Sequence, residues 1–390
     1  MIYMQILWTI KTFSMLNSLF SRSHVPIKFS SSIPSRLKSL VIEQATVQYA
    51  QDGPNEFLCQ EIVRKDFTLC FISFFLHQPY TYFMETPGDP VLQISMYGAL
   101  HYELSYFPGD ITVYHRHFNL FFSPSMRFRY KPERFGGSFQ LCEIWPSLTY
   151  LQQLGKKHER AAIFLQGVEK GQPTMLFEWS QIANVEVMAL LDLIGMHSGA
   201  HEWIDVYVNE IFEKLFESQA TIKKTRINPA IILKVYQAAD WLMEKEERND
   251  QIGLVAGSLE LSPAALSKAA NEFKWKMQFD RWTEEDLADF LAISLFQLNK
   301  GFKKLYNCTL KEFRRELNWQ IALNMIISKS ANLKRISSFS GYGSQRSFSR
   351  AFKRRFCKTP VEYAQDFEQK FQKFKNSVYR NRGEDLGGHL

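Results

Sequence analysis

A helical unit that occurs twice, fifty residues apart, most limits how this chain can fold. Ser294, Leu298 and Phe302 recur as Ser344, Phe348 and Phe352. In each set the serine hydroxyl can cap the start of a helix. The first apolar residue follows four positions later, and the second lies one helical turn after the first. The spacing predicts two copies of one short helix, each beginning after a serine.

The second copy lies in a strongly basic stretch. From Leu317 to Val361 there is no Asp or Glu, but there are nine Lys or Arg. Residues 300–390 contain 20 Lys or Arg against 7 Asp or Glu, whereas residues 1–299 contain 27 against 33. A mildly acidic body joined to a basic C-terminal module is typical of a protein that meets a polyanion at one end, and DNA is the first candidate.

Helical geometry separates apolar from cationic side chains in both copies. The apolar faces contain Leu298, Phe302 and Leu305 in the first copy and Phe348, Phe352 and Phe356 in the second. The opposite faces contain Phe296, Lys300 and Lys303 in the first copy and Arg346, Arg350 and Lys353 in the second. A charged face that is merely solvated is the alternative interpretation, but such faces normally mix both signs. A helix with one apolar face toward its own domain and one cationic face outward suits a major groove about 12 Å wide.

Capping signals predict short helices with sharp ends. Thr309 with Glu312 and Thr359 with Glu362 form capping-box patterns, and Thr283 with Asp286 forms a weaker one. Pro360 suits the first position of a helix, and Gly341 suits the left-handed residue that ends one. The pattern around Gly341 therefore predicts helix, turn, helix.

These residues, from about Asp286 to Tyr363, resemble the DNA-binding half of the arabinose-operon regulator (AraC/XylS) family. The second unit carries the resemblance most closely, through residues 336–342, 346–356 and 359–363. The first unit is in looser register, at Leu287, Ala288, Ser294, Leu298, Phe302, Lys303, Phe313 and Ala322. Three residues depart from the family pattern: Cys357 replaces a usual glycine, Asn318 a usual arginine and Ser337 a usual alanine.

The resemblance implies a sequence-specific transcription regulator, with two recognition helices in adjacent major-groove segments about one helical turn apart. The implied base-reading residues are Phe296, Asn299, Lys300, Gln345, Arg346, Ser349 and Arg350. The implied phosphate contacts, which position the protein without reading sequence, are Lys303, Lys353, Arg354, Arg355 and Lys358. Arg and Lys suit guanine, Gln and Asn suit adenine, and Phe suits the thymine methyl group. The implied partners are double-stranded DNA, a small-molecule effector, RNA polymerase and a second copy of the chain.

In the first half of the chain the sequence pattern predicts strands instead of helices. Short β-type runs are separated by turn residues. They are Thr46–Tyr49, Phe67–Phe75, Val91–Tyr97, Ile111–Tyr114, Asn119–Phe122 and Phe139–Ile144. Helical periods follow Pro146 and are clearest in Ile182–Met196 and Glu202–Phe216. The predicted fold class is α+β: a β-rich, cupin-like sensor domain with helices, followed by an all-α C-terminal domain with two helix-turn-helix units.

Composition and periodicity together predict five segments. They are a poorly ordered N-terminal extension at 1–40, a β-rich sensor and dimerisation domain at 41–220, a helical linker at 221–280, the DNA-binding domain at 281–375 and a disordered tail at 376–390. The linker repeats the helical spacing at Ser262, Leu266 and Ala270. We interpret this repeat either as a degenerate third helix-turn-helix unit that does not bind DNA or as a pair of packing helices.

One fragment resembles a metal site. Gly109 followed by His115 and His117 resembles the start of the metal-binding motif of cupin barrels, and strand alternation would place both imidazoles on one face. Phe121 and Phe122 occupy the positions of the expected glutamate, and the second half of the motif is missing. We therefore predict no metal and no cofactor. The alternative to a transcription regulator is a cupin-like metalloenzyme or small-molecule binder whose helical tail binds a protein partner.

No Ser/His/Asp or paired-carboxylate arrangement stands out, so the sequence gives no chemical case for an enzyme. The five cysteines are scattered without a C-x-x-C pair, which is typical of a reducing cytosol. The apolar run Phe67–Leu76 is shorter than the about 20 residues that cross a bilayer. We expect a cytoplasmic protein with no membrane partner.

Overall fold

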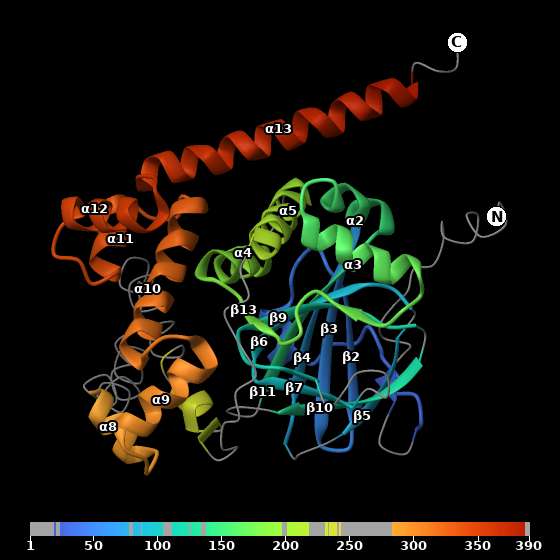
Figure 1. Ribbon diagram of the computed structural model, residues 1–390, viewed down its shortest axis with the longest axis horizontal. Helices are drawn as coiled ribbons and strands as arrows, with labels where there is room; N and C mark the ends of the chain where they lie inside the picture. Colours follow the sequence, from blue (N-terminus) through green and yellow to red (C-terminus); the bar gives the residue numbers. More distant parts are fainter. Residues whose placement is uncertain are drawn as a thin grey trace. The chain divides into compact units, whose positions relative to one another are not determined.

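Among the described residues, strands predominate up to Pro146 and helices predominate from Leu148 onward (Figure 1). The computed structural model describes residues 19–20, 24–77, 81–86, 88–103, 111–124, 126–133, 138–196, 201–217, 231–232, 234–239, 242 and 283–386. The chain divides into two compact units. The β unit comprises Met1–Ala183 and Phe216–Lys223, and the helical unit comprises Asn184–Leu215 and Lys224–Leu390.

Two antiparallel sheets form the β unit. One has the order β1 (Leu19–Phe20), β5 (Tyr82–Thr86), β10 (Met126–Glu133), β7 (Ala99–Glu103) and β8 (Ile111–Val113). The other has the order β12 (Thr174–Met175), β9 (His117–Phe122), β6 (Val91–Tyr97), β11 (Ser138–Pro146), β4 (Phe67–Phe75), β3 (Asn55–Val63) and β2 (Thr46–Asp52). A short strand, β13 (Gln181–Ile182), also pairs with β9. Two helices, α2 (Leu148–Gly155) and α3 (Glu159–Glu169), follow β11 and pack on each other.

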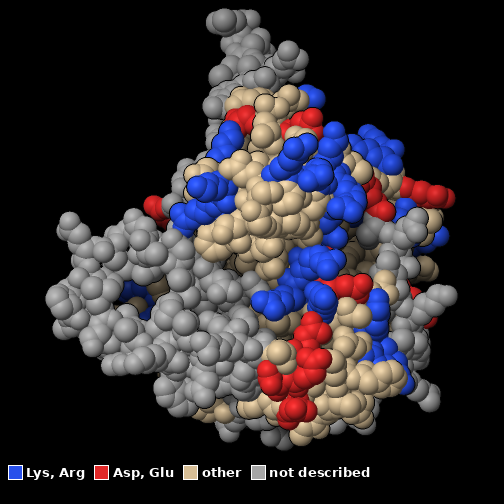
Figure 2. Space-filling model, turned by 90° about the vertical axis from the view of Figure 1, so that its left-hand side faces the viewer, with Lys and Arg blue, Asp and Glu red and all other residues tan. Residues whose placement is uncertain are grey.

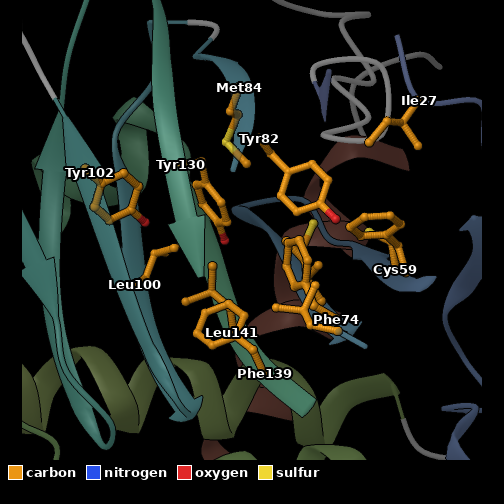
Figure 3. Packing of buried hydrophobic residues seen from close by; sticks show 14 of the residues in the cluster. Ile27, Cys59, Phe74, Tyr82, Met84, Leu100, Tyr102, Tyr130, Phe139 and Leu141 are labelled. Atoms are coloured by element: carbon orange, nitrogen blue, oxygen red, sulfur yellow. The ribbon is translucent and has the colours of Figure 1, made fainter. Parts of the chain in front are cut away.

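Aromatic rings from both sheets meet in the core of the β unit (Figure 3). Phe57 and Phe74 come from β3 and β4, whereas Tyr82 and Tyr130 come from β5 and β10 of the other sheet. Ring centroids lie 5.0 Å apart for Phe57 and Tyr82 and 5.8 Å apart for Phe74 and Tyr130. Buried aromatic contacts at such distances hold the two sheets together.

Helices of the helical unit surround α10. The unit contains α4 (Val185–Met196), α5 (His201–Glu217, whose last two residues belong to the β unit), α8 (Glu284–Phe290), α9 (Leu295–Tyr306), α10 (Leu310–Ile327), α11 (Leu333–Phe339), α12 (Gln345–Phe356) and α13 (Pro360–Leu386). α4, α9, α11 and α13 all pack against α10. Helical residues 231–232, 234–239 and 242 also belong to this unit.

The architecture confirms the predicted fold class, because a β-rich half precedes a helical half with two helix-turn-helix units. All six predicted β-type runs coincide with strands, and β4 and β6 have the predicted bounds. β3 was not predicted. Its first six residues are all buried, including the polar Asn55, Glu56 and Gln60, so polar residues do not mark an outer face there.

The structure differs from the predicted boundaries in three places. Residues 24–40 join the β unit: Leu37 is buried, and Ser30 exchanges two backbone hydrogen bonds of 2.8 Å with Tyr49. Residues 184–215, predicted in the sensor domain, belong to the helical unit because α4 packs along α10. α13 continues to Leu386, well past the predicted start of a disordered tail at 376. The repeat at Ser262 lies outside the described residues.

Candidate nucleic-acid interface

α8 and α9 form the first helix-turn-helix unit. Thr283 caps α8 in a reciprocal capping box with Asp286, and Ser294 caps α9 in the same way with Gln297. Between the two helices, Ala292 adopts a φ of 51°, which turns the chain sharply. The predicted helix start at Ser294 is confirmed, and its side chain satisfies one of the free amides at that end.

α9 is apolar on one side and exposed on the other. Leu298 and Phe302 are fully buried. Phe296 is 74% exposed, and the ammonium group of Lys300 lies 5.9 Å from the centre of its ring. Lys303 is also exposed, so three predicted DNA contacts point away from the protein core.

Asn299 behaves differently from its neighbours on α9. It is half-buried, and its Oδ1 accepts a hydrogen bond of 2.9 Å from the backbone amide of Leu310. The side chain therefore helps to satisfy the first turn of α10. Its Nδ2 group remains a donor.

The second unit contains α11 and α12, joined through Gly341. Asn332 caps α11, and Gly341 follows the helix with a φ of 75°, as the sequence predicts. Ser344 then caps α12 by accepting a hydrogen bond of 3.2 Å from the amide of Ser347. The second predicted helix start is confirmed.

An aromatic core supports α12 from behind. Phe348 and Phe352 are fully buried, and their rings lie 5.7 and 5.9 Å from that of Trp319 on α10. Phe356 extends the cluster, 5.6 Å from Trp319. Large rings behind the helix hold its opposite face outward.

The outward face of α12 is cationic. Gln345, Arg346, Arg350, Lys353, Arg354 and Arg355 are exposed, and Ser349 is half-buried. Within the described part of the chain, Arg346, Arg350, Lys353 and Arg354 form no ion pair and no hydrogen bond. Figure 2 shows Lys and Arg side chains gathered on the side of the helical unit that carries the recognition helices. Unpaired cations on one face create the positive potential that a phosphate backbone requires.

The other predicted phosphate contacts are paired inside the protein. Lys303 lies 3.3 Å from Glu312, Lys358 lies 2.9 Å from Asp366, and Arg355 pairs with Glu316. These carboxylate partners were not predicted, although the capping-box pattern at Thr309 places Glu312 shortly after the end of α9 in the sequence. The paired cations must exchange a carboxylate for a phosphate if they bind DNA.

The departures from the family pattern have visible consequences. Cys357 ends α12 with a φ of 59°, a left-handed conformation that glycine adopts more easily, and Asn307 ends α9 with a φ of 53°. Ser337 is buried, and its hydroxyl donates to the carbonyl of Lys334 at 2.8 Å. Within the described residues, Oδ1 of Asn318 is buried without a hydrogen-bond partner.

The histidines of the cupin-like fragment do not share a strand face, so that expectation is wrong. Arg116 has a φ of 58°, which places His115 in a turn before β9, while His117 begins the strand. Both imidazoles are buried, and burial, with a contribution from Arg116, holds the pKa of His115 well below its usual range. Among the described residues, no group of three His, Cys, Asp or Glu is placed to hold a metal.

A polar cluster lies inside the β unit and was not predicted. Gln93 donates a hydrogen bond of 2.6 Å to the fully buried carboxylate of Glu143, and the hydroxyl of Tyr102 donates to Gln93. The buried hydroxyl of Tyr130 has no hydrogen-bond partner among the described residues. Burial raises the pKa of Glu143 to about 8, against the opposing effect of Gln93. Strand alternation places Glu143 on the same face as Phe139 and Leu141, and this pattern in the sequence could have predicted a buried carboxylate.

No helix among the described residues is both long and apolar enough to span a bilayer.

Comparisons with known proteins agree with the geometry of the C-terminal half. A family profile described as "Helix-turn-helix domain" matches residues 287–366. The HTH-type transcriptional regulator AlkR of Acinetobacter baylyi is 30% identical over 84 residues. That match spans 22% of this chain and only 28% of the length of AlkR.

Two solved structures are similar over a longer part of the chain. ToxT from Vibrio cholerae O395 is 14% identical, covers 77% of this chain and 98% of its own, and has a TM-score of 0.27. The AraC-like transcriptional activator CuxR is 11% identical, covers 76% of this chain and 94% of its own, and has a TM-score of 0.28. The family profile and the two helix-turn-helix units together identify the C-terminal part of this chain as a helix-turn-helix domain of the arabinose-operon regulator (AraC/XylS) type.

Proposed function

We propose that this protein is a sequence-specific DNA-binding transcription regulator whose helices α9 and α12 read adjacent major-groove segments. The observation that carries the proposal is the outward face of α12, where Arg346, Arg350, Lys353 and Arg354 are exposed and unpaired among the described residues. Fully buried phenylalanines hold this helix from behind. A domain that only needed solubility would not keep one helix face free of negative charge.

In this proposal the two recognition helices read different base chemistry. On α12, Arg346 and Arg350 suit the O6 and N7 acceptors of guanine, while Gln345 suits adenine and Ser349 suits either. On α9, Lys300 suits guanine and the exposed ring of Phe296 suits a thymine methyl group. Asn299 keeps its Nδ2 donor, while Leu310 uses one of the two acceptor positions of its Oδ1. The predicted asymmetric site is therefore richer in guanine contacts at the segment that α12 reads.

Phosphate contacts fall into two groups in this proposal. Lys353 and Arg354 are free to bind phosphate directly, whereas Lys303, Arg355 and Lys358 must first leave Glu312, Glu316 and Asp366. These ion pairs are exposed and contribute at most about 1 kcal/mol each, so a phosphate displaces the carboxylates readily. The affinity contributed by Lys303, Arg355 and Lys358 then depends less on salt concentration than three unpaired cations would predict.

The β unit is the proposed site for a small-molecule effector. The buried cluster of Glu143, Gln93, Tyr102 and Tyr130 supports this role, because polar groups are rare inside an apolar sandwich unless a partner satisfies them. Effector and DNA must then change each other's affinity by the same factor. RNA polymerase and a second copy of the chain are further proposed partners, and the proposed location is the cytoplasm, where the DNA is accessible.

Capture of genomic DNA tests the proposal. Purified full-length protein is mixed with sheared genomic DNA at an ionic strength of about 0.15 M, and the retained fragments are sequenced. The deficient variant replaces Arg346, Arg350, Lys353 and Arg354 by Ala. The matched control removes the same charge from exposed positions of the β unit, by replacing Lys38, Lys65, Lys156 and Lys170 by Ala.

We expect wild-type protein and the β-unit control to enrich the same short sequence, and the α12 variant to enrich none. Repeating the capture with candidate metabolites then shows which of them changes the enrichment. Wild-type protein that retains fragments without any shared sequence would contradict sequence-specific binding.

A further inference from the structure

The helix pair α4–α5 connects the two units of the chain. Two residues separate the start of α4 from the end of β13, which pairs with β9 in the β unit. α5 ends at Glu217, and its last residues again belong to the β unit. Residues 184–215 nevertheless pack within the helical unit. The backbone therefore joins this helix pair to the β unit at both ends.

One polar contact fixes α4 to α10 beside the aromatic core. Oδ2 of Asp192 accepts a hydrogen bond of 2.5 Å from Gln320 and one of 3.0 Å from Asn324. Gln320 follows Trp319, whose ring packs against Phe348 behind α12. Hydrogen bonds to a charged acceptor are stronger than neutral ones, so Asp192 holds this part of α10 firmly.

A second contact leads from α4 to α12 through α13. The hydroxyl of Tyr363 donates a hydrogen bond of 2.7 Å to Oε1 of Glu186, which also pairs with Lys214 of α5 at 2.6 Å. The ring of Tyr363 lies 5.6 Å from Phe352 and 5.8 Å from Phe356. Glu186 thus binds the side chain that supports the buried face of α12.

α5 strengthens the same attachment. Trp203 stacks on Phe371 of α13 with ring centroids 3.9 Å apart and an angle of 5° between the planes. Glu210 of α5 lies 2.7 Å from Lys370, the residue before Phe371. Both helices of the pair therefore hold α13.

α9 rests on a different set of contacts. The ring of Phe302 packs on Phe313 near the start of α10, with centroids 5.3 Å apart. Gly301 lies against Val235 in the helical residues 234–239. The contacts of α4 with Gln320, Asn324 and Tyr363 lie at the other end of α10 and on α13, next to the core of α12.

We propose that the helix pair α4–α5 couples the β unit selectively to α12, through Asp192 on α10 and Glu186 on Tyr363. The inference rests on the proposed DNA-binding function and assigns its regulation to one of the two recognition helices. When the pair is held as in this structure, α12 is fixed in its reading position. When the pair is released, α12 loses its preference for its own DNA segment while α9 keeps reading.

Two variants of the full-length protein test the coupling. Tyr363→Phe removes one hydroxyl and keeps the ring, and Asp192→Ala removes the acceptor for Gln320 and Asn324. Tyr342→Phe is the control for the first, because Tyr342 packs on Trp319 in the same core and its hydroxyl has no hydrogen-bond partner among the described residues. Glu217→Ala is the control for the second, because it removes an exposed carboxylate from the end of α5.

Discrimination is measured with three duplexes: the site enriched from genomic DNA, the same site with the α12 segment scrambled and the same site with the α9 segment scrambled. We expect both test variants to lose about fivefold or more of the discrimination against the scrambled α12 segment, while their discrimination at the α9 segment stays at the wild-type level. Both control variants should match wild type at both segments.

Three outcomes would overturn the coupling: unchanged discrimination at the α12 segment, equal loss at both segments or a gain at the α12 segment. If Asp192→Ala does not fold, as circular dichroism would show, Tyr363→Phe decides alone. Failure of the wild-type protein to distinguish any of the three duplexes would instead contradict the proposed function.

Discussion

The backbone amide of Leu310 donates a hydrogen bond to the side chain of Asn299 at 2.9 Å, which ties the middle of α9 to the first turn of α10. An adenine is read by Asn through one donor and one acceptor together. Leu310 uses one of the two acceptor positions of Asn299 Oδ1, so a contact of this kind with adenine has to use the second position. Its first role in the structure is to hold two helices together.

Replacement of Asn299 tests that role. Asn299→Ala should lower the free energy of unfolding by roughly 1 kcal/mol, because the amide of Leu310 loses its acceptor. Asn299→Asp keeps an acceptor and should stay close to wild type in urea denaturation. Gln345→Ala, which changes an exposed residue at the start of α12, is the control and should shift stability by less than about 0.5 kcal/mol. Equal stability of Asn299→Ala and wild type would show that the bond contributes nothing.

Replacing Arg350 or Arg354 by Ala should weaken DNA binding in two different ways. Arg350→Ala should weaken a specific site by roughly 1–3 kcal/mol and relax base preference at one position, because Arg350 faces the groove in the proposed complex. Arg354→Ala should weaken all sequences alike and reduce the slope of log K against log salt by about 1. Fluorescence anisotropy over a salt series, with single-base variants of the site, measures both. Unchanged binding of Arg350→Ala at every position would count against the assignment.

Glu316→Gln should tighten DNA binding. Glu316 pairs with Arg355, and both side chains are about one-third exposed, so the pair itself contributes less than about 1 kcal/mol to stability. Removing the carboxylate frees a cation for phosphate and raises the salt dependence. Glu368→Gln is the control, since it frees Lys329, which is not a predicted DNA contact. Weaker binding of Glu316→Gln would mean that the carboxylate positions Arg355 for phosphate.

The helical half was more predictable from sequence than the β half, for physical reasons. Capping residues such as Thr309 and Ser344 act within one turn, so their patterns predicted helix starts that the structure confirms. The start of β3 is buried on both faces and gives no alternation. Which residues serve as ion-pair partners depends on tertiary packing: Glu186 and Tyr363 are 177 residues apart and still share a hydrogen bond. The predicted base-reading and phosphate residues remain predictions.

The packing of α4 also shows that tertiary contacts are hard to predict from sequence. Its helical period was predicted from sequence, but its packing partner was not, because an apolar face does not identify what it packs against. Asp192 becomes informative only once Gln320 and Asn324 are known to lie beside it.

Glu143 predicts a dependence of stability on pH. Burial raises its pKa from 4.5 to about 8. The folded state therefore keeps a proton that the unfolded state releases above pH 4.5, so the contribution of Glu143 is complete below that pH and declines as pH rises toward 8. Glu143→Gln cannot ionise and keeps the hydrogen bond from Gln93. Its stability relative to wild type should rise by up to roughly 5 kcal/mol between pH 4.5 and 8.

Urea denaturation at several pH values between 4.5 and 8.5 measures this difference. Glu43→Gln, at an exposed position of the β unit, is the control and should leave the pH profile of wild type unchanged. A constant difference between Glu143→Gln and wild type over this range would show that Glu143 does not keep its proton in the folded protein.

Gly301 should not tolerate even a methyl group. A Cβ atom built at this position would lie 2.3 Å from Cγ2 of Val235 and 3.3 Å from Cγ2 of Ile231, and both neighbours are β-branched and stiff. Alanine favours a helix over glycine by about 1 kcal/mol, but overpacking costs about 1–3 kcal/mol, so Gly301→Ala should be destabilised overall. Gly343→Ala is the control, because nothing lies within 4 Å of its added Cβ. Thermal unfolding should show a lower midpoint for Gly301→Ala alone, and a higher midpoint would mean that Val235 and Ile231 do not pack on α9.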